Sequence, residues 1–182
     1  CTSWATAYAA RTIDEAVNNG WADKALINRS AFAPMFVYAQ INTIRNDRNC
    51  QNGTYIDRAL QLMKVKGVPK MSSFTQLCAC DVPSNLFSDA LKDKITEYFT
   101  LFNSLETSEA RKVSAIKKAI SQDRPVLIGM EVYKSFDRAE GVWNGKRDVH
   151  RGGHAMCIIG YDDEMYGGAF ELMNSWGTDW GN

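Results

Sequence analysis

Three residue types that together can perform nucleophilic catalysis lie near the two ends of this 182-residue chain. Cys1 is the first residue, and His154 and Asn174 lie close to the other end. A thiol is activated as a nucleophile by an adjacent imidazole when a third group fixes the imidazole ring. An asparagine oxygen can fix the ring by accepting a hydrogen bond from one ring N–H. These residue types indicate acyl transfer through a Cys–His–Asn site.

A β-hairpin is predicted to carry the two partners of the thiol. Two apolar runs, residues 154–160 and 169–173, flank a polar loop that ends in glycine. If His154 lies opposite Asn174 in an antiparallel pair, the turn centres on Glu164, inside this loop. Side chains in directly opposite positions have Cβ atoms ~5 Å apart. The hairpin therefore predicts an imidazole that faces a side-chain amide.

The thiol is predicted to lie at the start of a helix. Residues 1–10 are rich in alanine, and the helical pattern stops at residues 18–20, which read Asn-Asn-Gly. Ala5, Ala9 and Ile13 have the spacing of a buried helix face. A cysteine at a helix N-terminus lies at the positive end of the helix dipole, and this favours the thiolate.

The chain resembles the papain-like cysteine peptidases, including divergent bacterial-type members, at both of its ends. The matching motifs are Cys1 at a helix start, Gly-His-Ala at 153–155, Gly-Tyr-Asp at 160–162 and Asn-Ser-Trp-Gly-Thr-Asp-Trp-Gly at 174–181. The Cys-to-His and Cys-to-Asn intervals exceed the about 130–150 residues of the family pattern, so we expect insertions in the middle.

The resemblance implies a fold and a division of the chain. The fold class is α+β, with a helical N-terminal lobe, an antiparallel β-barrel-like C-terminal lobe and the active site in the cleft between them. One peptidase unit would span residues 1–182, with the helical lobe over about 1–93 and the β-rich lobe over about 94–182. We expect both ends to be truncated, because the chain begins on its candidate nucleophile and stops within a motif.

The resemblance also implies roles for individual residues. Cys1 is the nucleophile, His154 the acid and base, and Asn174 the group that orients the ring, while Trp176 shields the Asn–His hydrogen bond. A glycine at position 129 would leave room in an apolar specificity pocket. The residues implied in substrate binding are Gly53, Thr54, Tyr55, Ile56, Gly129, Gly153, Ala155 and Trp176.

The start of the chain allows two alignments with the family motif Cys-Gly-Ser-Cys-Trp-Ala-Phe. One makes Cys1 the nucleophile and needs no gap. The other aligns Trp4 with the family tryptophan and puts Ser3 at the nucleophile position, which would give an inactive relative. We favour the first because it leaves the thiol at the helix end. The family oxyanion site also uses a Gln upstream of the nucleophile, outside the sequence given.

Composition excludes several classes of function. Acidic and basic residues are equal in number, 21 of each, and no basic stripe stands out, so nucleic acid is not an expected partner. No apolar run approaches the ~20 residues of a membrane span. The expected partners are a protein or peptide substrate and a propeptide or protein inhibitor. We expect no cofactor and no metal, and by family habit a secreted, periplasmic or lysosome-like compartment.

The five cysteines and two histidines leave other arrangements open. Cys50 could bridge to Cys78 or Cys80, as family members commonly carry disulfides in this lobe, or all five thiols could be reduced. A metal site is disfavoured because Cys78 and Cys80 lack a second close pair. The segment between the two histidines contains two glycines and is not helical, so we assign His150 to a solvent-exposed loop.

The remaining elements follow from apolar spacing. We expect a polar connection over residues 21–30 and a capping box at Thr54. Residues 136–151 are expected to form a loop. The expected helices are residues 30–41 with a stop at 46–49, residues 54–66, 86–92 and 108–121, and the expected strands are residues 94–99 and 126–132.

Two other functions remain open at this stage. The chain could be a catalytically inactive papain-like binding module. Alternatively, Cys1 could use its own α-amine as the base of an N-terminal-nucleophile amidohydrolase, which would leave the His154–Asn174 hairpin without a role. The sequence does not specify the natural substrate or distinguish endopeptidase from exopeptidase action.

Overall fold

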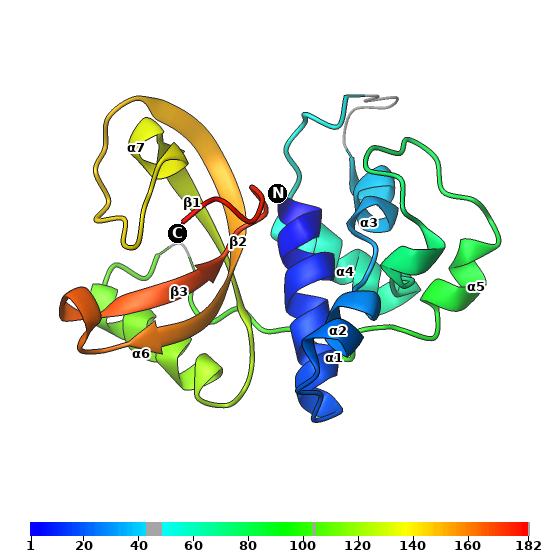
Figure 1. The fold of residues 1–182 in the computed structure, drawn as a ribbon, viewed down its shortest axis with the longest axis horizontal. Helices are drawn as coiled ribbons and strands as arrows, with labels where there is room; N and C mark the ends of the chain where they lie inside the picture. Colours follow the sequence, from blue (N-terminus) through cyan, green and yellow to red (C-terminus); the bar gives the residue numbers. More distant parts are fainter. Residues whose placement is uncertain (43–48, 104, 182) are drawn as a thin grey trace.

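The computed structural model describes residues 1–42, 49–103 and 105–181. Its elements form two groups that lie side by side (Figure 1). We call the group of helices from the first half of the chain the helical lobe. The group that contains, within the described residues, a three-stranded sheet and two α-helices is the sheet lobe. Helices followed by strands is the order predicted for an α+β protein.

The first helix of the helical lobe carries the N-terminal residues along the border with the sheet lobe (Figure 1). It has π-type hydrogen bonding over η1 and continues as a regular α-helix that ends before Gly20, as the sequence predicts. The helix predicted over residues 30–41 forms, but it begins later than predicted, at Pro34. The helices of this lobe are η1 Trp4–Arg11, α1 Thr12–Asn18, α2 Lys24–Arg29, α3 Pro34–Ile41, α4 Ile56–Lys66, η2 Met71–Ser73 and α5 Leu86–Ala90.

Gly67 ends α4 because two requirements meet at this position. Its φ of 75° lies in the region that favours glycine. A Cβ atom built on it would lie 1.7 Å from the carbonyl oxygen of Ala90. The close approach lets the end of α4 pack directly against α5.

Two predictions for this lobe are wrong in their local structure. The polar connection predicted over residues 21–30 contains α2, because the Asp23 side chain accepts a hydrogen bond from the Ala25 N–H at 2.8 Å and caps a short helix. The predicted capping box at Thr54 does not form. Tyr55 is the N-cap of α4 and makes no side-chain capping bond. The helix end predicted at residues 46–49 lies mostly outside the described residues.

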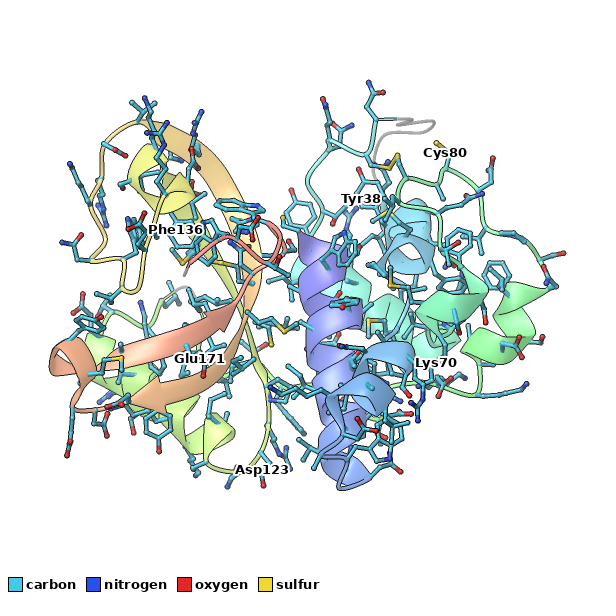
Figure 2. The ribbon with its side chains drawn as sticks, in the orientation of Figure 1. Tyr38, Lys70, Cys80, Asp123, Phe136 and Glu171 are labelled. Carbon is cyan, nitrogen blue, oxygen red and sulfur yellow. A yellow bond between two sulfur atoms is a disulfide. The ribbon has the colours of Figure 1, made fainter. Side chains whose placement is uncertain are left out.

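The helical lobe has a large apolar core and a disulfide. Its core includes Phe32, Phe36, Val37, Ala59, Met63 and Val68, with the helix face of Ala7. Cys50 is bonded to Cys78, which resolves the alternatives left open by the sequence. Cys80 is a free thiol on the same lobe, and Figure 2 shows it on the side away from the sheet.

Residues 94–99 do not form the strand that the sequence predicts. They run along α4 instead. The Ile95 N–H donates to the Met63 carbonyl at 3.3 Å, the Lys64 ammonium contacts the Glu97 carboxylate at 2.6 Å, and the Tyr98 hydroxyl donates to Gln61 at 3.2 Å. The Ile95 bond occupies a backbone N–H that a strand ladder would use, and the two side-chain bonds hold the segment along α4. The lobe boundary after residue 93 stays a prediction.

The sheet of the second lobe is antiparallel, with strand order β1-β2-β3. Within the described residues these strands do not close into the barrel-like lobe that the resemblance implies. The loop predicted over residues 136–151 is partly wrong, because α7 extends into its start and His150 begins β2 at its end. The elements are α6 Glu109–Ile120, β1 Val126–Tyr133, α7 Lys134–Asp137, β2 His150–Asp162, η3 Met165–Gly167 and β3 Ala169–Met173.

The hairpin between β2 and β3 forms as predicted, but with a different register. Cys157 pairs with Met173 and Ile158 with Leu172. Continuing this register places Asn174 across from Met156, two residues from His154 on the same face of the sheet. Side chains in such diagonal positions can still touch across an antiparallel pair.

Two small cores cover the sheet, one toward each end. Near α6, Ile116 and Ala119 pack on Val126 and Ile158. Near α7, Phe136 packs on Val132 and Met156, and Figure 2 shows Phe136 at the α7 end of the sheet lobe. No helix in the described part of the chain is long and apolar enough to cross a membrane.

Candidate active site

His154 and Asn174 are in direct contact. His154 lies in β2 with 7% of its surface exposed, and its Nε2 donates to Asn174 Oδ1 at 2.8 Å. The Ser175 backbone N–H donates to the same oxygen at 2.8 Å. Both partners are donors, so the oxygen of the Asn174 amide must be the atom that faces them. The ring is therefore held through Nε2, and Nδ1 is left for another partner.

The environment of His154 disfavours its charged form. Burial lowers the pKa of His154 below its usual value, while the hydrogen bond to Asn174 acts in the opposite direction. The first helix contacts β2 through η1, so the helix that begins after Cys1 packs against the strand that carries His154. In Figure 1 the N-terminus likewise lies beside the segment that follows β3.

Trp176 covers the His154 ring. The two rings are stacked, with centroids 4.6 Å apart and planes at 29°. Trp176 remains 40% exposed, so one side of it forms surface at the site. An indole in this position excludes water from one face of the imidazole and restricts the movement of the ring.

A group of aromatic side chains holds Trp176 in place. Phe136 of α7 is 1% exposed and contacts the rings of Trp143, Trp176 and Trp180 with centroids 5.0 to 5.5 Å apart. The Trp180 indole also donates to the Phe136 carbonyl at 3.2 Å. Sequence reasoning missed this role because it placed Phe136 in a loop. The two tryptophans of the Trp-Gly-Thr-Asp-Trp motif were the feature of the sequence that could have indicated an aromatic group here.

Cys1 is exposed and lies directly before the first helix. Its carbonyl accepts the Ala5 N–H at 2.9 Å, so the helical bonding begins at this residue. The Thr2 hydroxyl donates to the Thr54 carbonyl at 2.9 Å and ties the helix start to the chain before α4. Ser3, the alternative nucleophile, is only 2% exposed. Of these two candidates, Cys1 is therefore the one that is accessible.

The other cysteines are unsuited to this chemistry. Cys157 is fully buried in β2, and burial raises the pKa of its thiol to about 12. Cys50 and Cys78 are bonded to each other. Cys80 lies on the far side of the helical lobe (Figure 2).

Several residues predicted to bind substrate lie opposite one another across the two lobes. A Cβ atom built on Gly129 of β1 would lie 3.8 Å from Cδ1 of Ile56, the first residue of α4. Gly129 pairs with Ala155, which is buried. This places the small residues of the sheet against the apolar start of α4. Their role in substrate binding stays a prediction.

The remaining predicted residues surround this contact. Thr54 uses its carbonyl to hold Thr2, and Gly53 beside it has open space where a Cβ would be. Tyr55 is 62% exposed, with the guanidinium of Arg58 5.2 Å from its ring centroid. Gly153 lies directly before His154 and pairs with Glu131.

His150 differs from its predicted setting. It is exposed, as expected, but it belongs to β2 and its Nε2 donates to the Glu131 carboxylate. Its ring also packs edge-on against Tyr133. Among the described residues, no group of three or more His, Cys, Asp or Glu side chains is arranged to hold a metal ion.

Comparison with protein families and curated proteins gives consistent matches. The model described as papain family cysteine protease matches residues 38–182, a range that includes His154 and Asn174 but not Cys1. An uncharacterized peptidase C1-like protein of Acanthamoeba polyphaga mimivirus is 24% identical over 165 residues, which are 85% of this chain and 52% of the relative. A cathepsin B-like cysteine proteinase of Ostertagia ostertagi is 36% identical over 70 residues, or 38% of this chain and 40% of the relative.

Solved structures show that the fold is shared. Xylellain, a cysteine protease from Xylella fastidiosa, superposes with a TM-score of 0.74 at 24% identity, over 100% of this chain and 69% of that chain. The bromelain protease from Ananas comosus, solved with the E64 inhibitor, superposes with a TM-score of 0.69 at 22% identity, over 99% of this chain and 75% of that chain. The chain spans about half the length, or less, of the curated relatives cited here.

Proposed function

Because this chain belongs to the papain family of cysteine proteases, we propose that it hydrolyses peptide bonds in protein or peptide substrates through Cys1, His154 and Asn174. The observation that carries the proposal is the 2.8 Å bond from His154 Nε2 to Asn174 Oδ1, with the helix that follows Cys1 in contact with β2. The helical and sheet lobes, divided near residue 93, would supply the two halves of the site.

The mechanism has an acylation and a deacylation half. The Cys1 thiolate attacks the carbonyl carbon of the scissile bond, and the C–N bond breaks as the His154 imidazolium gives its proton to the leaving amine. His154 then takes a proton from water, whose oxygen attacks the thioester and releases the acid and the thiolate. Asn174 keeps Nδ1 directed at the reacting atoms throughout, because it holds Nε2.

Partial positive charge at the helix start supports the thiolate and the tetrahedral oxyanion. The first N–H groups of a helix have no partner inside the helix, and the dipole of the peptide units adds positive potential there. Cys1 occupies this position, since its carbonyl accepts the first helical hydrogen bond. Preorganised donors of this kind act on charge that develops during the reaction.

Labelling with a thiol-directed epoxide tests the proposal. We expect mass spectrometry to find the adduct on Cys1 and not on Cys80 or Cys157, with labelling lost in Cys1→Ala and strongly slowed in His154→Ala. Cys80→Ser is the matched control and should label like the parent protein. Absence of label on Cys1 would favour an inactive binding module. Peptide hydrolysis that survives His154→Ala would favour an N-terminal-nucleophile amidohydrolase.

An apolar specificity pocket is the second part of the proposal. Tyr55 and Ile56 would form one wall, and Gly129 of β1, which faces Ile56 across the two lobes, would form part of the other. A library of peptides varied at the residue next to the scissile residue measures this preference. We expect leucine and phenylalanine to be cleaved best, and a library in which charged residues are preferred would contradict it.

A further inference from the structure

A groove with a volume of about 580 Å³ lies on the helical lobe, between α4 and the end of α3. We call it the α4 groove. Ala59 and Met63 turn one face of α4 into the apolar core, and the groove follows the opposite face. The described residues that line it come from α3, α4 and the segment that runs along α4. The groove is therefore separate from the candidate active site.

The floor of the α4 groove is apolar. Ile41, the last residue of α3, is buried, Leu62 of α4 is half-buried, and Val65 of α4 is 54% exposed. Residues three apart in a helix are neighbours on its surface, so Leu62 and Val65 form a continuous strip. An apolar side chain of a partner would bury this strip and remove it from water.

Two hydrogen bonds join the elements that border the α4 groove. The Tyr98 hydroxyl donates to Gln61 Oε1 at 3.2 Å and links the segment beside α4 to the helix. The Lys66 ammonium donates to Gln40 Oε1 at 3.0 Å and links the end of α4 to α3. The walls of the groove are therefore joined to one another on both sides of its floor.

The charges along the α4 groove favour an anionic partner. Lys66 and Arg58 lie eight residues apart on α4, which is about 12 Å at the helical rise of 1.5 Å per residue. Lys66 contacts the neutral amide of Gln40, and the Arg58 guanidinium lies 5.2 Å from the ring centroid of Tyr55. Asp57, the acidic residue of the described lining, lies in the first turn of α4, where the helix dipole favours a carboxylate. The Lys66 end of the groove is therefore the end that would attract an acidic group.

The α4 groove begins where the proposed substrate pocket ends. Tyr55 and Ile56, which we place in the wall of the apolar specificity pocket, directly precede the first lining residues of α4. The about 12 Å between the two cationic residues correspond to about four residues of extended chain at 3.3 Å each. A protein substrate is long enough to occupy the pocket and the groove together, whereas a peptide that ends in the pocket is not.

We propose that the α4 groove is an exosite for a distal segment of a protein substrate, which places apolar residues on Leu62 and Val65 and a carboxylate at Lys66. This inference rests on the proposed peptidase function, because the occupant of the groove is the substrate of that site. Once the cleavable part is bound, binding of the distal segment becomes intramolecular and adds to the affinity. The groove is remote from the reacting atoms, so it should lower KM and leave kcat unchanged.

The kinetic test compares a short cleavable peptide with the same peptide carrying an apolar four-residue extension, at either end, that finishes in glutamate, glutamine or lysine. For one of the two ends, we expect the glutamate extension to have a KM about threefold lower than the glutamine extension, because an exposed ion pair contributes about fivefold or less. In Lys66→Glu this advantage should pass to the lysine extension, while the short peptide is cleaved at the parent rate. Val65→Ser should weaken all extended peptides alike.

Lys118→Glu is the matched control. It makes the same charge reversal in the last turn of α6, on the sheet lobe, and should leave every ratio unaltered. Hydrolysis in which the glutamate extension keeps its advantage in Lys66→Glu would overturn the inference alone. So would equal KM values for the short and the extended peptides.

Binding to Cys1→Ala separates this inference from the proposed function, because it requires no turnover. Binding of the glutamate-extended peptide that depends on Lys66, without hydrolysis by the parent protein, would support the groove as a peptide site and overturn the proposed function. The four-residue extension by itself is the last probe, and we expect it to bind far more weakly than the linked peptide. If it binds equally tightly, the groove takes a separate protein segment and its assignment to the substrate is wrong.

Discussion

The helical lobe and the sheet lobe hold their shares of the site in different ways. The helical lobe presents Cys1 at the end of a helix that lies against a large apolar core, and a disulfide further stabilises that lobe. The sheet lobe presents His154 and Asn174 on a hairpin whose two cores are small. Its ring stack depends on Trp176, which in turn rests on Phe136. Single side chains should therefore matter more in the sheet lobe.

Replacing Phe136 with alanine should produce the largest change. It tests most directly whether the sheet lobe depends on single side chains. Loss of a fully buried phenylalanine costs about 3–5 kcal/mol of unfolding free energy. Because Trp176 loses its support, epoxide labelling of Cys1 should also slow. Denaturant unfolding and labelling rates measure both effects. Phe99→Ala removes a 70% exposed ring and should change neither. Equal effects of the two variants would contradict the role of the aromatic group.

Removing the disulfide should affect stability and spare the chemistry. The double variant Cys50→Ser, Cys78→Ser opens a bridge between residues 28 apart in sequence and should lose about 3 kcal/mol. Under conditions where it is folded, we expect Cys1 to be labelled at the parent rate, since its helix keeps its core. Cys80→Ser should unfold like the parent. A labelling defect in the folded double variant would show that the helical lobe does not hold Cys1 independently of the bridge.

Asn174→Ala tests the sheet half of the site more finely. Without the amide, the His154 ring loses its hydrogen-bonded orientation, and misplacement of a catalytic group costs up to about 100-fold in rate. We expect kcat/KM for a peptide substrate to fall about 10- to 100-fold with little change in KM. Asn144→Ala, in an exposed position, is the control. Unaltered turnover in Asn174→Ala would rule out the orienting role.

Thr2→Val should give the smallest effect and tests the helical half. The change removes the 2.9 Å hydrogen bond from the Thr2 hydroxyl to the Thr54 carbonyl, which links the helix start to the chain before α4. A bond of this kind contributes about 1 kcal/mol, so the unfolding midpoint should fall slightly. Thr107→Val, at an exposed position, should leave the midpoint in place. If Thr2→Val lowers activity more than Asn174→Ala, single side chains matter more in the helical lobe than in the sheet lobe.

Elements with strong local patterns were predictable from the sequence. The first helix, α4 and α6 have apolar faces and end signals within a few residues, so their bounds are close to those predicted. The misplaced segments are those where a distant partner decides. Residues 94–99 alternate weakly, and bonds to α4 determine their path. The short α7 depends on Phe136, whose partners Trp176 and Trp180 lie far along the chain.

The sequence by itself determined which chemical groups are present and that the segments carrying them are a helix start and a hairpin. These follow from residue identity and local periodicity, which require no knowledge of distant contacts. Only the tertiary structure decided how the groups meet. The hairpin register, offset from the predicted one, brings His154 to Asn174 diagonally. The pairing of β1 with β2 sets Glu131 beside Gly153, because register depends on packing across strands and not on either strand alone.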